Sequence, residues 1–466
     1  GETLQYSLPL LRGTVPPTTP PVQSVLVKTS AADGYTHVLR WPVVAGHFKV
    51  LAPLRPASNS LLIYPDTAPY ITTHPASASA SATSLPNPPA PAPGPIPPLA
   101  MSLHYEMQSN QCTVRLVYVL AKDGDGTFEA PEGEPNSVES ASARIKLAGH
   151  LMQSMMAEKL VEHGFPVRRT FRLKDEGRVQ VFRCSLTMAE AHAMHDHKLY
   201  DRLAAELSTL PESDTTINVA VMSMTRMDPK RKETHMPRAH TALGGGNLGL
   251  FGSGNLHTWA QSLEELVWRL QDQAMVDGVH FFDDSCGRST KWANYSTGLG
   301  ATLHELGHCF GLPHTAHGES IMARGFDYLS RSFLVEETPC KTSSGLRPVL
   351  KDDETGWHRS SAVHLFYHPH MSLDGSGLPQ SNIELDCVDR RLGSSVTIRS
   401  TAGLRHCGYS KDGDIYVHEE FLEIPPDYLH IDPLYMKRLF PNHVGPIGIS
   451  TIDDAGCQAS GEISIS

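Results

Sequence analysis

Residues 304–314 constrain the fold of this chain more than any other stretch, because they read His-Glu-Leu-Gly-His-Cys-Phe-Gly-Leu-Pro-His and fit the pattern HExxHxxGxxH. On a helix, His304 and His308 are four residues apart, so both imidazoles project from one face and can share a cation. Glu305 lies beside the first ligand, offset around the helix, where it can reach a metal-bound water without being a ligand. The stretch therefore predicts a helix that carries a metal centre.

The end of this helix supplies the third ligand. Gly311 can adopt a positive φ and end the helix in a sharp turn, which brings His314 back towards the metal. His317 is a competing third ligand, but His314 carries the expected spacing. Three protein ligands leave one tetrahedral position open, as in catalytic zinc sites. We therefore expect one Zn²⁺ per chain; a metal-free buried helix and a purely structural metal site are the alternatives.

A methionine follows at Met322, within Ser-Ile-Met-Ala-Arg-Gly. This segment predicts a Met-turn, a tight loop that places a thioether beneath the metal site. At these residues the chain resembles the metzincin clan of zinc endopeptidases. The resemblance implies a metzincin-like catalytic domain, one zinc ion and peptidase activity.

The chain is also similar to a family of eukaryotic zinc metallopeptidases known best from fungi. The resemblance covers roughly residues 30–460 and is strongest from 235 to 370. The matching stretches are His-Thr-Ala-Leu-Gly-Gly-Gly-Asn-Leu (240–248), Gly-Leu-Gly-Ala-Thr-Leu-His-Glu-Leu-Gly-His (298–308), Ile-Met-Ala-Arg-Gly-Phe (321–326), Trp-His-Arg (357–359), Phe-Tyr-His-Pro (366–369) and, upstream, Gly-His-Phe-Lys-Val-Leu (46–51).

A second candidate site is the glycine-rich stretch around Gly244, Gly245, Gly246 and Asn247. It lacks a following Gly-Lys-Ser/Thr, which disfavours a phosphate-binding loop. The resemblance implies that it is the edge strand of a sheet that borders the active-site cleft. Glycine lets another backbone approach closely, so an extended peptide could pair with this strand. A glycine-rich bulge without a substrate role is the alternative.

Zinc chemistry assigns a role to each candidate residue. Glu305 is expected to take a proton from the attacking water and deliver it to the leaving amine. In some metzincins a tyrosine two residues after the methionine stabilises the oxyanion. Here that position is Arg324, and the nearest tyrosine is Tyr328, so both are candidate donors. A gluzincin with Glu336 or Glu337 as third ligand is the rival at the level of the fold.

The predicted function is a zinc endopeptidase that acts on a peptide or protein. A zinc hydrolase of non-peptide amides, or a glycan- or protein-binding module with a vestigial metal site, are the alternatives. The formal charge of −11 disfavours binding to nucleic acid. No run approaches about 18 apolar residues, so no membrane span is expected. The sequence says nothing about oligomeric state.

The eight cysteines form no CxxC pair, and the one glycosylation sequon, at Asn294, lies close before the metal helix. Both features favour a cytoplasmic location over a secreted one. We interpret the 25 histidines, most of them single in loops, as compositional and not as further metal sites.

At 466 residues the chain is long enough for two or three modules of an α+β protein. We expect a β-rich segment over 1–74, a Pro/Ala/Ser linker or loop over 75–98, a metzincin-like peptidase domain with a twisted mixed sheet over 99–394, and a second β-rich segment over 395–466, which could pack with residues 22–71. Apolar residues at helical spacing predict helices over 140–162, 189–207 and 262–274, and a further helix is expected over 357–367.

Overall fold

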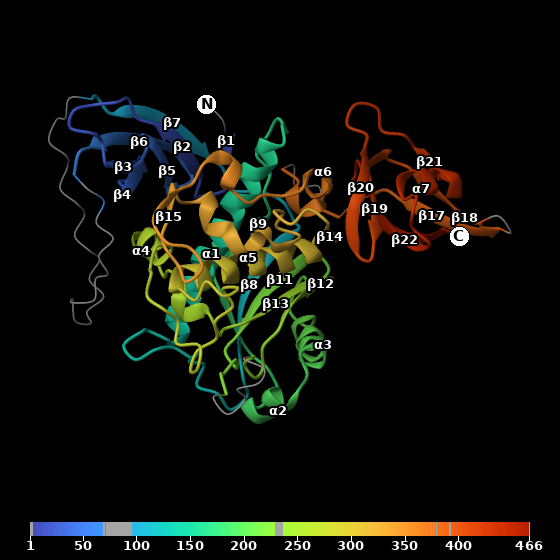
Figure 1. Ribbon diagram of the computed structural model, residues 1–466, viewed down its shortest axis with the longest axis horizontal. Coiled ribbons are helices and arrows are strands. Elements are labelled where there is room, and N and C mark those ends of the chain that lie inside the picture. The colour runs from blue at the N-terminus through green and yellow to red at the C-terminus, as the bar shows by residue number, and fades with distance from the viewer. Residues whose placement is uncertain are drawn as a thin grey trace.

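The computed structural model describes residues 3–68, 70, 96–228, 236–373, 375, 377–378, 380–390 and 393–465. Most of the expected linker, residues 75–95, lies outside the described residues. Helices and several sheets occur together along the chain, which confirms the α+β class (Figure 1). None of the helices in the described part of the chain has the length and apolarity needed to cross a membrane.

The middle of the molecule is a mixed sheet with the strand order β10-β8-β11-β13-β12, and β9 also pairs with β8. All pairs are parallel except β12 with β13, so β12 is an antiparallel edge strand. The strands are β8 (Thr113–Leu120), β9 (Arg172–Leu173), β10 (Gln180–Arg183), β11 (Thr216–Met222), β12 (Ala242–Gly245) and β13 (Leu248–Gly252).

Helices cover both faces of this sheet, which explains why β8 and β11 are buried along their whole length. Alternate residues of β8 face opposite ways: Leu116 packs in the core with α1 and α5, whereas Val117 packs in the core with α3. The helices are α1 (Val138–Glu162), α2 (Met188–Ala193), α3 (Asp196–Leu207), α4 (Leu263–Arg269), α5 (Lys291–Cys309), α6 (Arg359–Tyr367) and α7 (Pro433–Leu439). Short 3₁₀ segments are η1 (Lys174–Gly177), η2 (Leu256–Thr258), η3 (Arg324–Ser332), η4 (Lys351–Asp353) and η5 (Pro369–Met371).

Two of the expected helices differ from the structure. The helix expected over 189–207 is two helices, α2 and α3, because Met194 is extended and His195 starts α3 as its N-cap. The helix expected over 262–274 is shorter, ending at Arg269. The helix predicted over 140–162 is confirmed as α1, and its first turn is capped by the Ser137 side chain.

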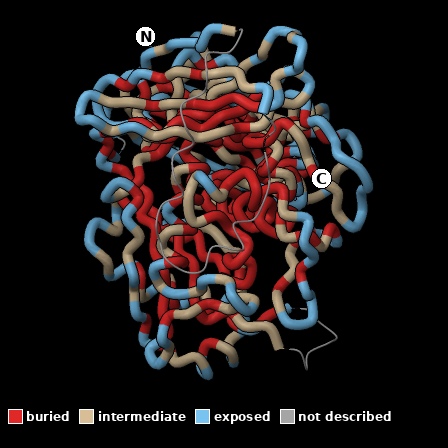
Figure 2. Tube along the Cα trace, turned by 90° about the vertical axis from the view of Figure 1, so that its left-hand side faces the viewer, coloured by how far each residue is buried: buried red, intermediate tan, exposed pale blue. Residues whose placement is uncertain are grey.

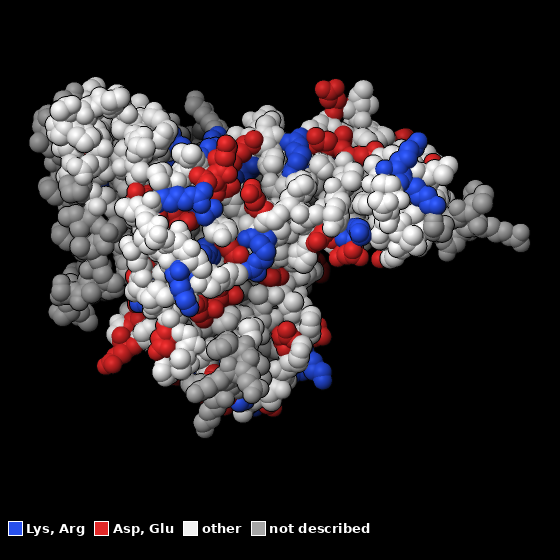
Figure 3. Space-filling model, in the orientation of Figure 1, with Lys and Arg blue, Asp and Glu red and all other residues white. Residues whose placement is uncertain are grey.

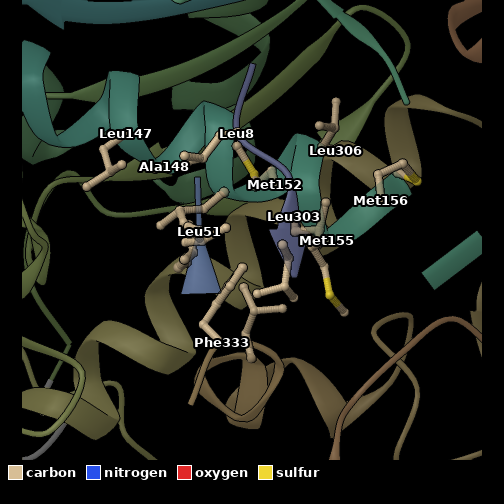
Figure 4. Close-up of a cluster of buried hydrophobic side chains, with 14 of the residues drawn as sticks. Leu8, Leu51, Leu147, Ala148, Met152, Met155, Met156, Leu303, Leu306 and Phe333 are labelled. Atoms are coloured by element: carbon tan, nitrogen blue, oxygen red, sulfur yellow. The ribbon is translucent and has the colours of Figure 1, made fainter. Parts of the chain in front are cut away.

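The N-terminal strands form a seven-stranded sheet with the order β1-β7-β6-β3-β4-β5-β2. Its strands are β1 (Thr3–Leu4), β2 (Leu10–Thr14), β3 (Ser24–Ala31), β4 (Thr36–Val44), β5 (His47–Leu51), β6 (Ala57–Asp66) and β7 (Leu99–Tyr105). Buried residues run from this sheet into the middle of the molecule (Figure 2). Leu8 and Leu51 pack in one core with Met155 of α1 and Leu303 of α5 (Figure 4). The N-terminal sheet is therefore part of the support of helix α5.

The C-terminal strands form two further sheets, ordered β14-β20-β19-β22-β23 and β17-β18-β21. The strands are β14 (His314–Thr315), β17 (Ile383–Arg390), β18 (Gly393–Ser400), β19 (Leu404–Lys411), β20 (Asp414–Glu420), β21 (Tyr428–Ile431), β22 (Gly445–Asp453) and β23 (Gln458–Ile465). A small hairpin joins β15 (Glu336–Glu337) to β16 (Arg347–Pro348).

We call residues 383–465 the C-terminal module, because their buried residues form a core of their own. Among the described residues, none of its strands pairs with a strand of residues 22–71. The N-terminal sheet and the C-terminal module lie at opposite ends of the molecule (Figure 1). The domain boundaries given above stay a prediction.

Candidate metal centre

Helix α5 carries the first two histidines and is packed unusually closely by its neighbours. A Cβ atom at Gly298 would overlap the Asn255 side chain, and one at Gly300 would overlap the Phe326 carbonyl oxygen. A Cβ atom at Gly307 would overlap the Met322 sulfur. These glycines let three other segments touch the helix backbone, so α5 is fixed in position on several sides.

Three imidazoles converge at the end of α5. The Nε2 atom of His308 lies 3.1 Å from Nε2 of His304 and 3.1 Å from Nε2 of His314. Within the described part of the chain, these three residues are the group of His, Cys, Asp or Glu side chains arranged to hold a metal ion. Burial lowers the pKa of His304 to about 4 and also lowers the pKa of His308, so both are neutral, as metal ligands must be.

Backbone carbonyls fix the orientation of two of these rings. Nδ1 of His304 lies 2.7 Å from the Ile321 oxygen, and Nδ1 of His308 lies 2.8 Å from the Leu312 oxygen. Each neutral ring therefore carries its proton on Nδ1 and leaves the lone pair of Nε2 free to face the other rings.

The expected sharp turn after α5 is confirmed at Gly311, whose φ is +80°. The Gly311 N–H bonds the His308 oxygen (3.0 Å) and the Leu312 N–H bonds the Gly307 oxygen (3.1 Å), which is the hydrogen-bond pattern of a Schellman motif. A Cβ atom at Gly311 would also overlap the amide oxygen of Gln458 in the C-terminal module. The turn thus needs glycine for its conformation and for this contact.

The third histidine is held by the C-terminal module. His314 lies in β14, which pairs in parallel with β20, so that His314 is opposite Asp414 and Thr315 opposite Ile415. The Ala316 N–H donates to the Ile415 oxygen at 3.1 Å. Residues about 100 positions away in the sequence therefore position His314, and no local sequence signal indicates this pairing.

Met322, the residue of the expected Met-turn, is fully buried beneath α5. Its turn is anchored by residues 355–358. The Thr355 hydroxyl donates to the Glu319 oxygen (3.0 Å), and the Ile321 N–H donates to the Gly356 oxygen (2.8 Å). Because Ile321 in turn accepts from His304, this segment supports the first ligand.

A buried ionic cluster ties this segment to the N-terminal sheet. The carboxylate of Glu354 lies 2.7 Å from Lys49, 2.5 Å from Lys159 and 2.9 Å from Arg12. Burial by itself would raise the pKa of Glu354, but these positive charges outweigh it and lower the pKa to about 2. Glu354 thus stays ionised and joins the N-terminal sheet to the segment that supports His304. On the molecular surface, acidic and basic side chains are interspersed over the face shown in Figure 3.

Glu305 follows His304 in helix α5 and contacts the edge strand β12. Burial raises its pKa to about 7, and a hydrogen bond from the backbone N–H of Gly244 works in the opposite direction. A Cβ atom at Gly244 would overlap the Glu305 carbonyl oxygen, so the strand lies directly on the helix backbone. The structure therefore brings two of the predicted site residues, Glu305 and Gly244, into contact.

The other edge-strand candidates contact the α3 side of the sheet. The Tyr200 hydroxyl of α3 lies 2.9 Å from both the Gly245 and Leu248 carbonyl oxygens. Gly246, with a φ of +51°, and Asn247 form the exposed turn between β12 and β13, where the Asn247 amide donates to the Ser213 oxygen at 2.6 Å. These contacts hold the hairpin from the α3 side and leave the edge of β12 half exposed.

The two candidate oxyanion donors have different surroundings. Arg324 is exposed, lies 2.9 Å from the Asp327 carboxylate and stacks over Phe326, whose ring centroid is 5.1 Å from that of His304. Tyr328 lies under the guanidinium groups of Arg288 and Arg331. Of the two, Arg324 is the one whose charge acts on His304.

The competing ligands lie elsewhere. His317 stacks on His358 with ring centroids 4.1 Å apart, and Glu337 pairs with Arg331 at 2.7 Å. Neither His317, Glu336 nor Glu337 belongs to the metal-binding group found among the described residues.

The close contact between β12 and α5 gives a test of the edge strand. The change Gly244→Ala is expected to push the strand off the Glu305 backbone, to destabilise the fold by roughly 1–3 kcal/mol and to lower kcat/KM of the peptidase activity predicted from the sequence about 100-fold, because ångström displacements impair catalytic alignment. Gly249→Ala in β13 is the matched control, since its Cβ would meet no atom closer than 3.6 Å. Peptide hydrolysis and thermal unfolding of both variants provide the measurement. Equal effects in the two variants would contradict the assigned contact.

Residues 1–403 match the family described as "Putative peptidase family", so the chain belongs to this family. A protein of Schizosaccharomyces pombe, named a putative zinc metalloproteinase, is 28% identical over 330 residues, covering 66% of this chain and 52% of the relative. A protein of Saccharomyces cerevisiae with the same description is 27% identical over 311 residues, covering 58% of this chain and 44% of the relative. The chain thus spans about half the length of these curated relatives.

Among solved structures, the crystal structure of wild-type OgpA from Akkermansia muciniphila aligns with 76% of this chain and 93% of its own. The identity is 14% and the TM-score is 0.43, a likeness that carries no argument about substrate.

Proposed function

We propose that the protein is a zinc-dependent endopeptidase of the metzincin type. The observation that carries the proposal is the convergence of three imidazole Nε2 atoms, two of them with their Nδ1 atoms on backbone carbonyls, beside a buried carboxylate. The names of the two fungal relatives support the same class of activity. A buried turn at Met322 beneath the helix supports the metzincin type.

The residues fit a zinc ion. Ligands about 2.0–2.1 Å from a tetrahedral zinc ion are about 3.3–3.4 Å apart, close to the 3.1 Å between the Nε2 atoms of His308 and each of its neighbours. Neutral imidazoles are preferred zinc ligands, and three of them leave a position for water. His304, His308 and His314 would hold one ion per chain.

Zinc, when bound, would supply a Lewis acid that makes water more acidic and polarises the substrate carbonyl. The chain's own residues transfer the proton, align the substrate and stabilise the oxyanion. Glu305, whose pKa of about 7 suits proton transfer at neutral pH, accepts a proton from the attacking water and returns it to the leaving amine. Strand β12 is the edge along which an extended peptide pairs, and Arg324 donates to the oxyanion.

The first experiment measures zinc per chain by mass spectrometry and cleavage of an unbiased peptide library with and without a chelator. We expect one zinc per chain and cleavage that stops when the metal is removed. Zinc without cleavage would assign the site to another amide substrate. Absence of zinc from protein purified without chelator would overturn the proposal.

A further inference from the structure

A pocket of about 590 Å³ opens beside strand β12, on the side of the sheet covered by α3. Tyr200 and Ala204 of α3 and Ser208, the residue that caps α3, line one side, and Asn218 of β11 and residues 244–248 of the β12–β13 hairpin line the rest. The pocket and Glu305 are therefore on opposite faces of the same edge strand.

The two faces of β12 follow from its pleat. A Cβ atom at Gly244 would point into α5 at Glu305, whereas one at Gly245 would have only the Tyr200 hydroxyl within 4 Å, at 3.9 Å. Side chains opposite one another on neighbouring strands lie on the same face of a sheet. In a peptide paired with β12, the residue opposite Gly244 faces Glu305, and the residue opposite Gly245 faces the pocket.

The wall of the pocket carries no charge. No Asp, Glu, Lys, Arg or His lines it, and burial raises the pKa of Tyr200 to about 12. Two of its polar groups are already bonded: the Tyr200 hydroxyl to the hairpin carbonyls, and the Asn218 amide oxygen to Arg115 at 3.0 Å. A charged side chain would enter without a partner, at a cost in free energy, whereas an apolar or aromatic one would not.

We propose that this pocket binds a large uncharged side chain of the substrate, at the position that pairs with Gly245. The proposal rests on the peptidase function above and names the substrate class. Gly244, Gly245 and Gly246 line the pocket and carry no side chains. Because the chain itself places no side chain there, the pocket has room for a side chain of the substrate. The backbone of β12 accepts many sequences, and the pocket selects among them.

The test digests a peptide library, randomised at each position around the cleaved bond, with the wild type and three variants. Ala204→Phe and Ser208→Phe place a ring in the pocket. Ala205→Phe is the matched control, because Ala205 is the next residue of α3 but is exposed and does not line the pocket. Thermal unfolding checks that each variant is folded.

We expect the wild type to prefer residues such as Phe, Leu or Met over Asp or Lys at one position. Both pocket variants should lower kcat/KM for those peptides on the order of 10- to 100-fold relative to peptides with Ala there. The Ala205 variant should keep the wild-type preference. Cleavage with the same preference in all four proteins would overturn the pocket and leave the peptidase function standing.

If the wild type cleaves nothing, the same library is selected by binding to the Glu305→Gln protein with and without Ala204→Phe. Enrichment of large uncharged residues that Ala204→Phe removes would uphold the pocket while the peptidase function fails. No enrichment at any position would overturn the pocket as well.

Discussion

The change Glu305→Gln is expected to leave one zinc per chain and to lower peptide hydrolysis on the order of 100- to 10,000-fold, the usual contribution of general acid–base catalysis. The amide has nearly the shape of the carboxylate, so α5 and its contact with β12 should be preserved. It cannot accept the proton of the attacking water. Metal content and kcat/KM, measured on the same preparation, provide the test.

Two controls separate the proton-transfer role from metal binding and from charge. His308→Ala is expected to lose both zinc and hydrolysis, because Nε2 of His308 lies between the other two ligands. Glu132→Gln makes the same chemical change at an exposed loop position and is expected to change neither. A Glu305→Gln protein as active as the wild type would refute the mechanism.

The second large effect is expected in acid. Within the described part of the chain, and apart from His304 and His308, ten histidines have a pKa that burial lowers, namely His150, His163, His240, His257, His358, His364, His368, His370, His406 and His418. The folded protein keeps them neutral, whereas the unfolded chain protonates them near pH 6.5. The free energy of unfolding is therefore not reduced by these histidines above about pH 6.5, and it falls as the pH is lowered towards 4.

The size of this effect follows from three of these residues that are almost fully buried. The pKa of His257 is lowered to about 3 and those of His364 and His370 to about 4. At pH 5 each costs about 2 kcal/mol of stability by proton linkage. Three such residues approach the whole stability of a typical domain, roughly 5–15 kcal/mol, so we expect unfolding in mild acid.

Urea unfolding between pH 7.5 and 4.5, with a chelator present to remove metal effects, measures this loss. His364→Leu should make the free energy of unfolding less dependent on pH, by up to about 1.4 kcal/mol per pH unit. His197→Leu, at an exposed position of α3, should leave the dependence unchanged. Stability that is constant from pH 7 to 5 would contradict the burial of neutral histidines.

The clustering of the three histidines was predictable because it depends on local spacing. Two histidines one turn apart, a glycine that ends the helix and a third histidine three residues later come together by short-range geometry, and the structure places His304, His308 and His314 accordingly. The remote supports were not predictable. Glu354 and Gln458 reach the site through tertiary contacts that no periodicity of the sequence records.

The fold, like the site, was predictable from the sequence only in its locally determined features. The α+β class follows from strands and helices with clear patterns, but the break between α2 and α3 does not. Ala191 of α2 and Leu199 of α3 bury against the same core, so the apolar spacing continues across the extended residue Met194. The burial of the histidines was also missed, because a single histidine, such as His364 of α6 or His406 of β19, carries no sign in the sequence of the interface it will enter.

The pairing of β14 with β20 means that the position of His314 depends on the C-terminal module. The region of family similarity ends at residue 403, just before β19 and β20. A recombinant fragment cut there would retain Glu305 and all three histidines but would lose the strand against which His314 is held. A chimaera of two relatives would therefore have to take residues 404–465 and the turn at 311–316 from the same parent protein.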